Sequence, residues 1–406
     1  MVLNAEHYDE GWAAVQQLTD GARSESVRTS TPMFGRAEQL TPIDRAGELH
    51  EKLSLLRALL DRRSLPSTVL TGTAEVAWAT GGLTNPMEPG STASPLWLVV
   101  THETVAAVTT NVELARLELE SGLLEAGVQI HTAPWHEPGG LQRVARELGG
   151  DLVDLDEDLI ELRLALSRRE QERLAALGAD AAAALEDALS AWTPGETDHA
   201  VQARVAAGLE AKGAFGACLI VGGDDRVERF RHPLAAGAPM LRLVMAVVVA
   251  TRHGLHTAAT RFAFAGSLDA SVRRARDASL EIEAATLAAH RPGVTYGQVL
   301  ETLDRAYSDA GHEGEWRDHY QGGPVGYRQR EFEIVPGQTD STWYGAGLGV
   351  GHAVAWNPSV AGGGKAEDTY LLEDAGLRRL TDAGGSWPLE ADGRPAVLDI
   401  ETGGAA

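Results

Sequence analysis

Cysteine is nearly absent from this sequence, and so are long apolar runs. The single cysteine, Cys218, excludes an internal disulfide framework and a multi-cysteine zinc site. The longest apolar candidate, Leu241 to Ala250, contains Arg242 and is far shorter than the roughly 20 residues that a membrane-spanning helix needs. No basic region followed by an apolar stretch opens the sequence. We therefore expect a soluble cytoplasmic protein without a membrane partner.

Basic residues are also scarce. Lys plus Arg is 35 and Asp plus Glu is 58, which gives a net charge of −23. Such a field repels polyphosphate backbones, so we expect no nucleic-acid partner. The 406 residues, 44% hydrophobic and 23% charged, have an ordinary globular composition and suffice for two or three domains.

The first half reads as an extension followed by a small α/β domain. Residues 1–45 are polar and mixed, and we interpret them as an N-terminal extension. Leucines at helical spacing then predict a helix from Ala46 to Arg62. Short apolar runs at 68–71, 96–101 and 104–108 predict strands, and Asn111 is a candidate cap for a helix over 112–121. A charged helical segment over 155–170 connects to the second half, so the α/β domain is placed at 46–165.

The second half, 166–400, contains an internal repeat. Pro194-Gly195-Glu196-Thr197 and Pro292-Gly293-Val294-Thr295 each begin a predicted helix, and each helix follows a long Ala-rich one. Matching apolar positions fall at the same offset in both copies, which indicates a duplicated unit with pseudo-two-fold symmetry.

Strand-like stretches follow each copy of the repeat. Leu241 to Ala250 and Leu255 to Gly266 predict a long hairpin that turns at Arg252-His253-Gly254. Residues 345–358 and 367–372 are the strand candidates after the second copy. We predict an α+β domain with a curved antiparallel sheet.

This layout resembles the creatinase, aminopeptidase P and prolidase superfamily. In the first half, Val76-Ala77-Trp78-Ala79-Thr80-Gly81-Gly82 resembles a strand-and-loop segment of that family. Phe230-Arg231-His232-Pro233 resembles the segment that carries the family's substrate-side histidine, and Glu367-Asp368-Thr369 resembles its closing segment. The resemblance implies a creatinase-like N-terminal α/β domain followed by a pita-bread catalytic domain.

The sequence departs from the family at its metal site. The family's peptidases hold two divalent ions with two Asp, one His and two Glu, and these positions fall here near Val247 and on Ala258, Gly323, Asn357 and Glu367. No Asp or Glu occurs from Pro233 to Ser267. A two-metal site needs several anionic ligands. We therefore predict that the dimetal centre is absent and expect no cofactor, with creatinase as the family's precedent for hydrolysis without metal.

Three residues are the candidates for catalysis. His232 matches the family position that serves as acid/base in creatinase, and histidine suits proton transfer near neutral pH. Glu367 is the surviving metal-ligand position, although a structural salt bridge with Arg261 would also explain it. His319 keeps a polar group beside the Gly-rich loop near the family site.

A wider set of residues is predicted to contact the substrate. Lys365, two residues before Glu367, is a candidate to replace the positive charge of a metal. Arg330 falls where the peptidases often hold a second substrate histidine, and its guanidinium suits a carboxylate. The other candidates are His256, Arg261, Tyr327, Trp356 and Asn357. A single-metal site formed by His256, His232 and Glu367 is the alternative to a metal-free one.

Three functions remain open at this level. The main prediction is a metal-independent hydrolase or lyase that acts on a C–N bond of a small polar nitrogen-containing substrate, with His232 as acid/base. A peptidase of the Xaa-Pro type with atypical metal ligands is the first alternative, and its substrate would be a short peptide. A non-catalytic binding member of the superfamily is the second. The resemblance also implies a homodimer, with the loop Leu83 to Pro89 as the part that reaches the active site of the partner subunit.

Overall fold

The computed structural model describes residues 44–401 and 404–405, and the predicted N-terminal extension lies almost entirely outside them. The described residues belong to one compact unit. The division into domains at residue 165 therefore stays a prediction. No helix of residues 44–401 is long and apolar enough to cross a membrane.

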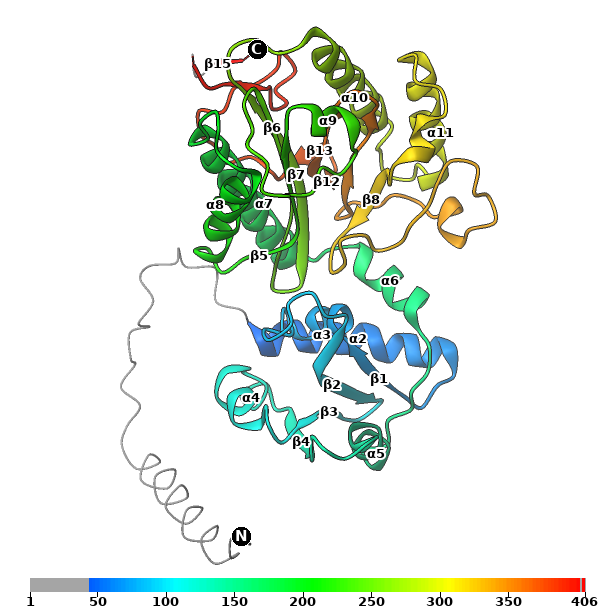
Figure 1. Ribbon diagram of the computed structural model, residues 1–406. Helices are drawn as coiled ribbons and strands as arrows, with labels where there is room; N and C mark the ends of the chain where they lie inside the picture. Colours follow the sequence, from blue (N-terminus) through cyan, green and yellow to red (C-terminus); the bar gives the residue numbers. More distant parts are fainter. Residues whose placement is uncertain (1–43, 402–403, 406) are drawn as a thin grey trace, which may run out of the picture. The chain divides into compact units, whose positions relative to one another are not determined.

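The N-terminal part is built on a four-stranded sheet in the order β1-β2-β3-β4, in which only the β3–β4 pair is parallel (Figure 1). Helix α2 covers this sheet with a row of buried leucines, as its spacing predicted. The elements are α2 (Arg45–Arg63), β1 (Ser67–Gly72), α3 (Thr73–Thr80), β2 (Ala93–Thr101), β3 (Val105–Thr110), α4 (Leu114–Glu120), β4 (Gln129–Ala133), α5 (Gly140–Glu147) and α6 (Asp156–Leu164).

Three local predictions in this part were wrong. The segment around Trp78 is the buried helix α3, because an apolar run of this length fits a buried helix as well as a strand. Asn111 does not cap α4, because that helix begins after Glu113. The Asn111 side chain instead accepts a hydrogen bond from the backbone N–H of Trp135. The single connecting helix predicted over 155–170 is in fact two helices. The first, α6, ends at Leu164, and Ser167 begins α7 with a capping box to Glu170.

The described C-terminal part has two larger sheets flanked by helices and a separate two-stranded sheet, β10–β11. One of the larger sheets has the order β15-β14-β7-β6-β5 and the other β13-β12-β9-β8. Its helices are α7 (Arg168–Ser190), α8 (Asp198–Glu210), α9 (Asp225–Arg229), α10 (Ala270–Ala288), α11 (Tyr296–Asp309), η1 (Glu315–Asp318) and η2 (Thr342–Gly345). Its strands are β5 (Phe215–Gly223), β6 (Leu243–Arg252), β7 (Leu255–Phe264), β8 (Gly322–Val325), β9 (Ala353–Trp356), β10 (Ser359–Val360), β11 (Gly364–Lys365), β12 (Asp368–Glu373), β13 (Gly376–Arg379), β14 (Leu398–Asp399) and β15 (Gly404–Ala405).

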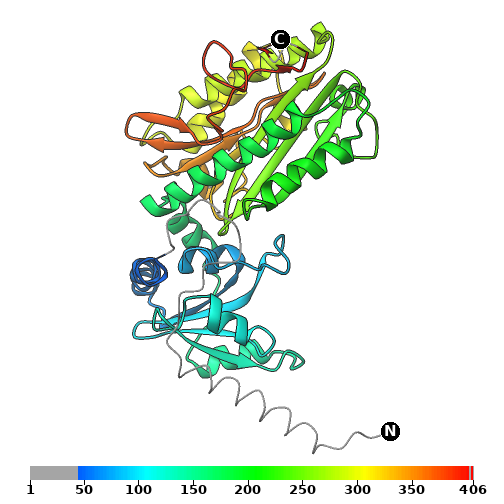
Figure 2. The same ribbon diagram turned by 90° about the vertical axis from the view of Figure 1, so that its left-hand side faces the viewer.

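The predicted pseudo-two-fold duplication is confirmed. Thr197 and Thr295 cap α8 and α11 in the same way, each accepting a backbone N–H three residues on. The backbone N–H groups of Gly195 and Gly293 donate to the carbonyls of Met240 and Leu348, at 2.8 and 2.9 Å. Helices α7 and α8 pack on β5 to β7, while α10 packs on β10 and β11 and α11 packs on α10, so that the sheets lie between the two helix pairs (Figure 2). This is the α+β pita-bread architecture.

The two sheets of the C-terminal part meet where β7 passes β12. The backbone N–H of Thr260 donates to the carbonyl of Glu367 at 2.9 Å, and the N–H of Ala258 donates to the hydroxyl of Thr369 at 2.8 Å. The curved sheet expected from the sequence is therefore two sheets joined by these bonds, with a parallel β7–β14 pair in one of them. The junction places the start of β12 beside the middle of β7.

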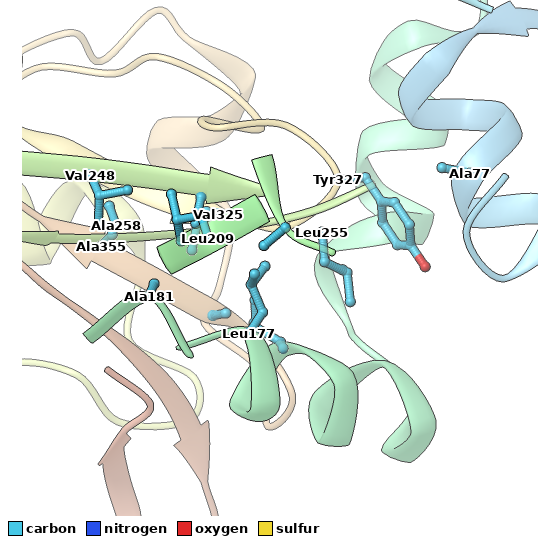
Figure 3. Close-up of a cluster of buried hydrophobic side chains, with 14 of the residues drawn as sticks. Ala77, Leu177, Ala181, Leu209, Val248, Leu255, Ala258, Val325, Tyr327 and Ala355 are labelled. Carbon is cyan, nitrogen blue, oxygen red and sulfur yellow. The ribbon is translucent and has the colours of Figure 1, made fainter. Parts of the chain in front are cut away.

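The predicted hairpin β6–β7 turns at His253 and Gly254, which both have positive φ angles of 54° and 77°. A Cβ atom at Gly254 would lie 2.4 Å from the Cβ of Ala77, so only glycine permits this approach to α3. Figure 3 shows Tyr327 reaching toward Ala77 on the same side, next to Leu255. The tip of the hairpin is thus packed against the N-terminal part.

Candidate active site

The candidate site lies at the junction of the two sheets and is centred on Glu367. This residue directly precedes β12 and is 6% exposed. Its Oε2 accepts a hydrogen bond of 2.7 Å from the hydroxyl of Thr260 on β7. The β9–β12 ladder pairs Trp356 with Asp368, which places Asn357 opposite Glu367. The carboxylate is therefore held by a hydrogen bond from β7, and Asn357 lies next to Glu367 in the strand register.

Lys365 brings a positive charge to the same place. Its Nζ lies 3.9 Å from Oε2 of Glu367, and the two side chains are 3% and 5% exposed. Burial lowers the pKa of Lys365, and the charge of Glu367 acts in the opposite direction. A Cβ atom at Gly364 would lie 2.1 Å from the carbonyl oxygen of Ala275, so β11 is pressed directly onto α10. This contact holds the backbone from which the ammonium extends.

Two histidines face each other beside this ion pair. The Nε2 atoms of His232 and His319 are 3.0 Å apart, so one donates and the other accepts. Nδ1 of His319 is buried and has no hydrogen-bond partner among the described residues. Burial, then the charge of Lys365, lowers the pKa of His232, while Glu367 raises it. Burial, then Lys365 and His232, lowers the pKa of His319 to about 2. Both imidazoles are therefore neutral at pH 7.

Further polar groups complete the site, and only Asn357 among them was predicted. Its Oδ1 is buried and has no partner among the described residues. Arg231 holds the segment of His232 through Glu315 at 2.9 Å and the hydroxyl of Ser359 at 3.3 Å. Cys218 lies close enough to Glu367 and Lys365 for their charges to affect it, and burial raises the pKa of its thiol. This setting of Cys218 could not be predicted from the sequence, because only the fold brings β5 near Lys365 and Glu367.

The structure thus brings together five predicted residues, namely His232, His319, Asn357, Lys365 and Glu367. Two more, His256 and Arg330, lie to one side. His256 has its Nδ1 3.4 Å from the carbonyl oxygen of Gly326, and burial lowers its pKa to about 4. The charge of Arg330 reaches both Lys365 and His319.

Arg261, which was predicted to contact the substrate, has its guanidinium bound by structural partners. Neighbouring strand residues point to opposite faces, so Arg261 points away from the face of Thr260. Its guanidinium is 1% exposed and binds Glu186 at 3.1 Å and Asp368 at 2.9 Å. The expected salt bridge of Arg261 is therefore made to Asp368 and not to Glu367.

Trp356 and Tyr327, which were also predicted to contact the substrate, each have a buried hydrogen-bond partner. The Trp356 indole is fully buried, and its Nε1 donates to Nε2 of His290 at 2.9 Å. The Tyr327 hydroxyl donates to Oε1 of Glu170 at 2.8 Å, and Glu170 also binds Lys52. Buried aromatic polar atoms need such partners, which explains why these side chains turn inward.

The comparisons with known proteins support the superfamily that the sequence resembles. The model of metallopeptidase family M24 matches residues 172–374, which is half of the chain. The chain belongs to metallopeptidase family M24. No curated protein matches it.

Several solved structures share the fold of this M24 member. The dipeptidase PepE from Mycobacterium ulcerans has a TM-score of 0.67 at 22% identity, with 83% of this chain and 96% of that chain covered. The prolidase from Pyrococcus horikoshii OT3 has a TM-score of 0.65 at 20% identity, covering 82% and 98%. The Xaa-Pro dipeptidase from Bacillus anthracis has a TM-score of 0.63 at 17% identity, covering 82% and 97%. Likeness at these identities establishes the fold.

The residues of this M24 member do not fit the dinuclear metal centre that the sequence resemblance implies. Within residues 44–401, no three His, Cys, Asp or Glu side chains are grouped so that they could hold an ion. Ala258, at one ligand position, is 5% exposed and belongs to the apolar core, next to Ala355 in Figure 3. The remaining carboxylate of Glu367 already faces an ammonium. A divalent ion there would meet a like charge and too few anionic donors.

Proposed function

We propose that this M24 member is a metal-independent hydrolase or lyase that breaks a C–N bond of a small polar nitrogen-containing substrate. The observation that carries the proposal is the buried ammonium of Lys365, 3.9 Å from Glu367, which is the one metal-ligand position implied by the resemblance that keeps a carboxylate here. A fixed positive charge in a desolvated site stabilises negative charge that develops on a reacting oxygen. The protein would therefore supply by a side chain what a metal supplies in its relatives.

His232 is the proposed acid/base. Its ring is partly exposed, and its lowered pKa keeps it neutral at pH 7, so it accepts a proton from an attacking water. The water oxygen then bonds to the substrate carbon, the C–N bond breaks, and the proton moves from His232 to the leaving nitrogen. His319 orients the ring of His232 through their 3.0 Å contact.

Asn357 and Glu367 are proposed to hold the substrate. The buried Oδ1 of Asn357 is an acceptor without a partner among residues 44–401, and a substrate N–H would satisfy it. The carboxylate of Glu367 suits a second N–H or a protonated nitrogen. Two acceptors side by side favour a substrate with several nitrogen donors, such as an amidine, a guanidine or an amide.

A peptidase is the second candidate, because the similar solved structures are described as a dipeptidase, a prolidase and an Xaa-Pro dipeptidase. A panel of amides, amidines, guanidines and Xaa-Pro dipeptides separates the two. We expect turnover of a C–N substrate that withstands chelation and is lost in His232→Ala. The control is His50→Ala, which alters an exposed histidine on α2. Turnover of Xaa-Pro peptides alone, abolished by chelation, would favour the peptidase. Unaltered turnover in His232→Ala would remove the proposed mechanism.

A further inference from the structure

A cavity apart from the candidate active site lies between the second half of α7 and the C-terminal segment 383–400. Its volume is about 360 Å³, which falls within the roughly 300–1,000 Å³ typical of small-molecule sites. None of its lining residues has a part in the chemistry proposed above, so that chemistry leaves this space unused.

Small side chains keep the cavity open. Along α7 it extends over about two turns, from Ala183 to Ser190. On the C-terminal segment the small lining residues are Ala383, Gly385 and Ser386. A Cβ atom at Gly385 would meet nothing within 4 Å. The space therefore remains available to a ligand.

The indole of Trp387 provides the largest apolar surface in the lining. Its Nε1 donates to the carbonyl oxygen of Ala396 at 3.0 Å, and the ring packs against the hydrophobic core. Leu398, which is 6% exposed, and Ile400 add apolar surface. These walls favour a hydrocarbon body, and the face of an indole also attracts a cation.

The charged residues of the lining are both carboxylates. Glu186 has a side chain that is 12% exposed, and its Oε1 accepts a hydrogen bond from Nε of Arg261 at 3.1 Å. Its Oε2 has no donor among the described residues. Burial raises the pKa of Glu186, and the charge of Arg261 acts in the opposite direction. Asp187 is exposed and makes no ion pair with any of residues 44–401.

One positive charge serves two carboxylates here, because Arg261 also binds Asp368 at 2.9 Å. The lining itself contains no Lys, Arg or His. The cavity therefore carries a surplus of negative charge, and a ligand cation would compensate it.

A divalent metal ion is a poor match for these groups. Such ions need several oxygen ligands, and no three His, Cys, Asp or Glu side chains in the part of the chain that the structure describes are grouped to hold one. A primary ammonium group has three N–H donors and one positive charge. Oε2 of Glu186, the carboxylate of Asp187 and the hydroxyl of Ser190 are acceptors in the lining. The rest of the volume would hold the organic body.

We propose that this cavity is a binding site for a small organic amine. The ammonium group pairs with Glu186 and Asp187, and the hydrocarbon body lies against Trp387 and Leu398. The assignment does not depend on the proposed hydrolase or lyase activity, because no residue of that mechanism lines the cavity.

Isothermal titration calorimetry of the full chain with three matched probes tests this site. The probes are 2-phenylethylamine, 2-phenylethanol and 3-phenylpropionate, which share the phenylethyl body and differ in charge. We expect the amine to bind at least about tenfold more tightly than the alcohol, because its hydrogen bonds to carboxylates are charge-assisted. The carboxylate should bind most weakly. Equal affinity of the three probes would overturn the proposal.

Variants locate the binding. Asp187→Asn removes one charge at an exposed position, so it should weaken the amine at least about threefold and leave the alcohol unchanged. Ala183→Leu enlarges a side chain of the lining and should weaken both probes. Asp277→Asn is the matched control, because Asp277 is an exposed residue within α10 that makes no ion pair with a described residue.

The candidate active site also offers a carboxylate to an amine, and Glu367→Gln separates the two locations. Amine affinity that is unaltered in Asp187→Asn and Ala183→Leu but lost in Glu367→Gln would place the amine at Glu367 and overturn the proposal. Unaltered affinity in both cavity variants would overturn it even if Glu367→Gln failed to fold. Amine binding that is weakened in both cavity variants would support the site even if no turnover were found.

Discussion

Lys365 and Glu367 form a buried pair across 3.9 Å at the junction of β7 and β12. The carboxylate also accepts the hydroxyl hydrogen of Thr260, so both charges are compensated within the fold. An isolated charge in such surroundings would be costly, whereas a pair with supporting hydrogen bonds is tolerated. The positive charge of Lys365 and the negative charge of Glu367 thus balance without an added metal ion.

The first prediction concerns this pair. Lys365→Met should destabilise the protein by about 3 kcal/mol, because it leaves the carboxylate of Glu367 buried and unpaired. Adding Glu367→Gln to that variant should restore part of the loss, since no charge then remains. Urea unfolding of the two single variants and the double variant measures the coupling. Strictly additive effects would show that the two side chains do not interact.

The second prediction concerns the pH dependence of activity. Burial and Lys365 disfavour the charged form of His232, so its pKa lies below 6.5 and the base form persists into mildly acidic solution. Activity should therefore be lost only as pH falls through this lowered pKa. Lys365→Met removes one cause of the lowering, so the pKa values of His232 and His319 should rise. Histidine C–H resonances followed by NMR report both values, and unchanged titrations would contradict the electrostatic account.

The third prediction concerns acid stability and rests on His290. Burial lowers the pKa of His290 to about 4, and its Nε2 accepts the indole N–H of Trp356 at 2.9 Å. The unfolded state then binds more protons between pH 4 and 6.5, so the free energy of unfolding must fall as pH decreases through that window. His290→Gln keeps an acceptor but cannot titrate. Its unfolding free energy should fall less steeply, by up to about 1.4 kcal/mol per pH unit. Equal slopes in both proteins would reject this role of His290.

The fourth prediction concerns restored carboxylates. Ala258→Asp together with Asn357→Glu should lower the melting temperature rather than create a metal site, because position 258 is 5% exposed within the apolar core. The new carboxylates would also repel Glu367 and raise a pKa. Differential scanning calorimetry with and without Mn²⁺ checks this. A large stabilisation by Mn²⁺ would show that the pocket accepts an ion after all.

The fifth prediction is the homodimer. Met87 in the loop 83–89 is 62% exposed. Sedimentation equilibrium at micromolar concentration should give the mass of two chains, and Met87→Asp should shift it toward one. A mass of one chain for the unaltered protein would contradict the predicted homodimer.

Much of the fold could be predicted from the sequence, because the sequence patterns that predict its elements are local. The leucine spacing of α2, the Pro-Gly helix starts and the Gly254 turn each depend on a few neighbouring residues. The buried helix α3 was not accessible, because an apolar run between glycines lacks a distinguishing period.

The site was accessible only in part, because long-range contacts decide which polar side chain faces inward. Position in the family pattern identified His232, and the spacing of two residues from Glu367 identified Lys365; both lie near Glu367 in the structure. The sequence could not show that the Arg261 guanidinium pairs with Glu186 and Asp368, or that the Trp356 indole donates a hydrogen bond to His290. Such partners lie far apart along the chain.

The most direct test of the account is metal content measured together with turnover. The protein is purified in the presence of EDTA, its zinc, manganese, iron and cobalt are determined by mass spectrometry, and the best C–N substrate from the panel is assayed in chelator. We predict far less than one metal ion per chain and full activity, with no gain on adding Mn²⁺ or Zn²⁺. One or two tightly bound ions per chain, whose removal abolishes activity and whose return restores it, would contradict the central claim that Lys365 stands in for the metal.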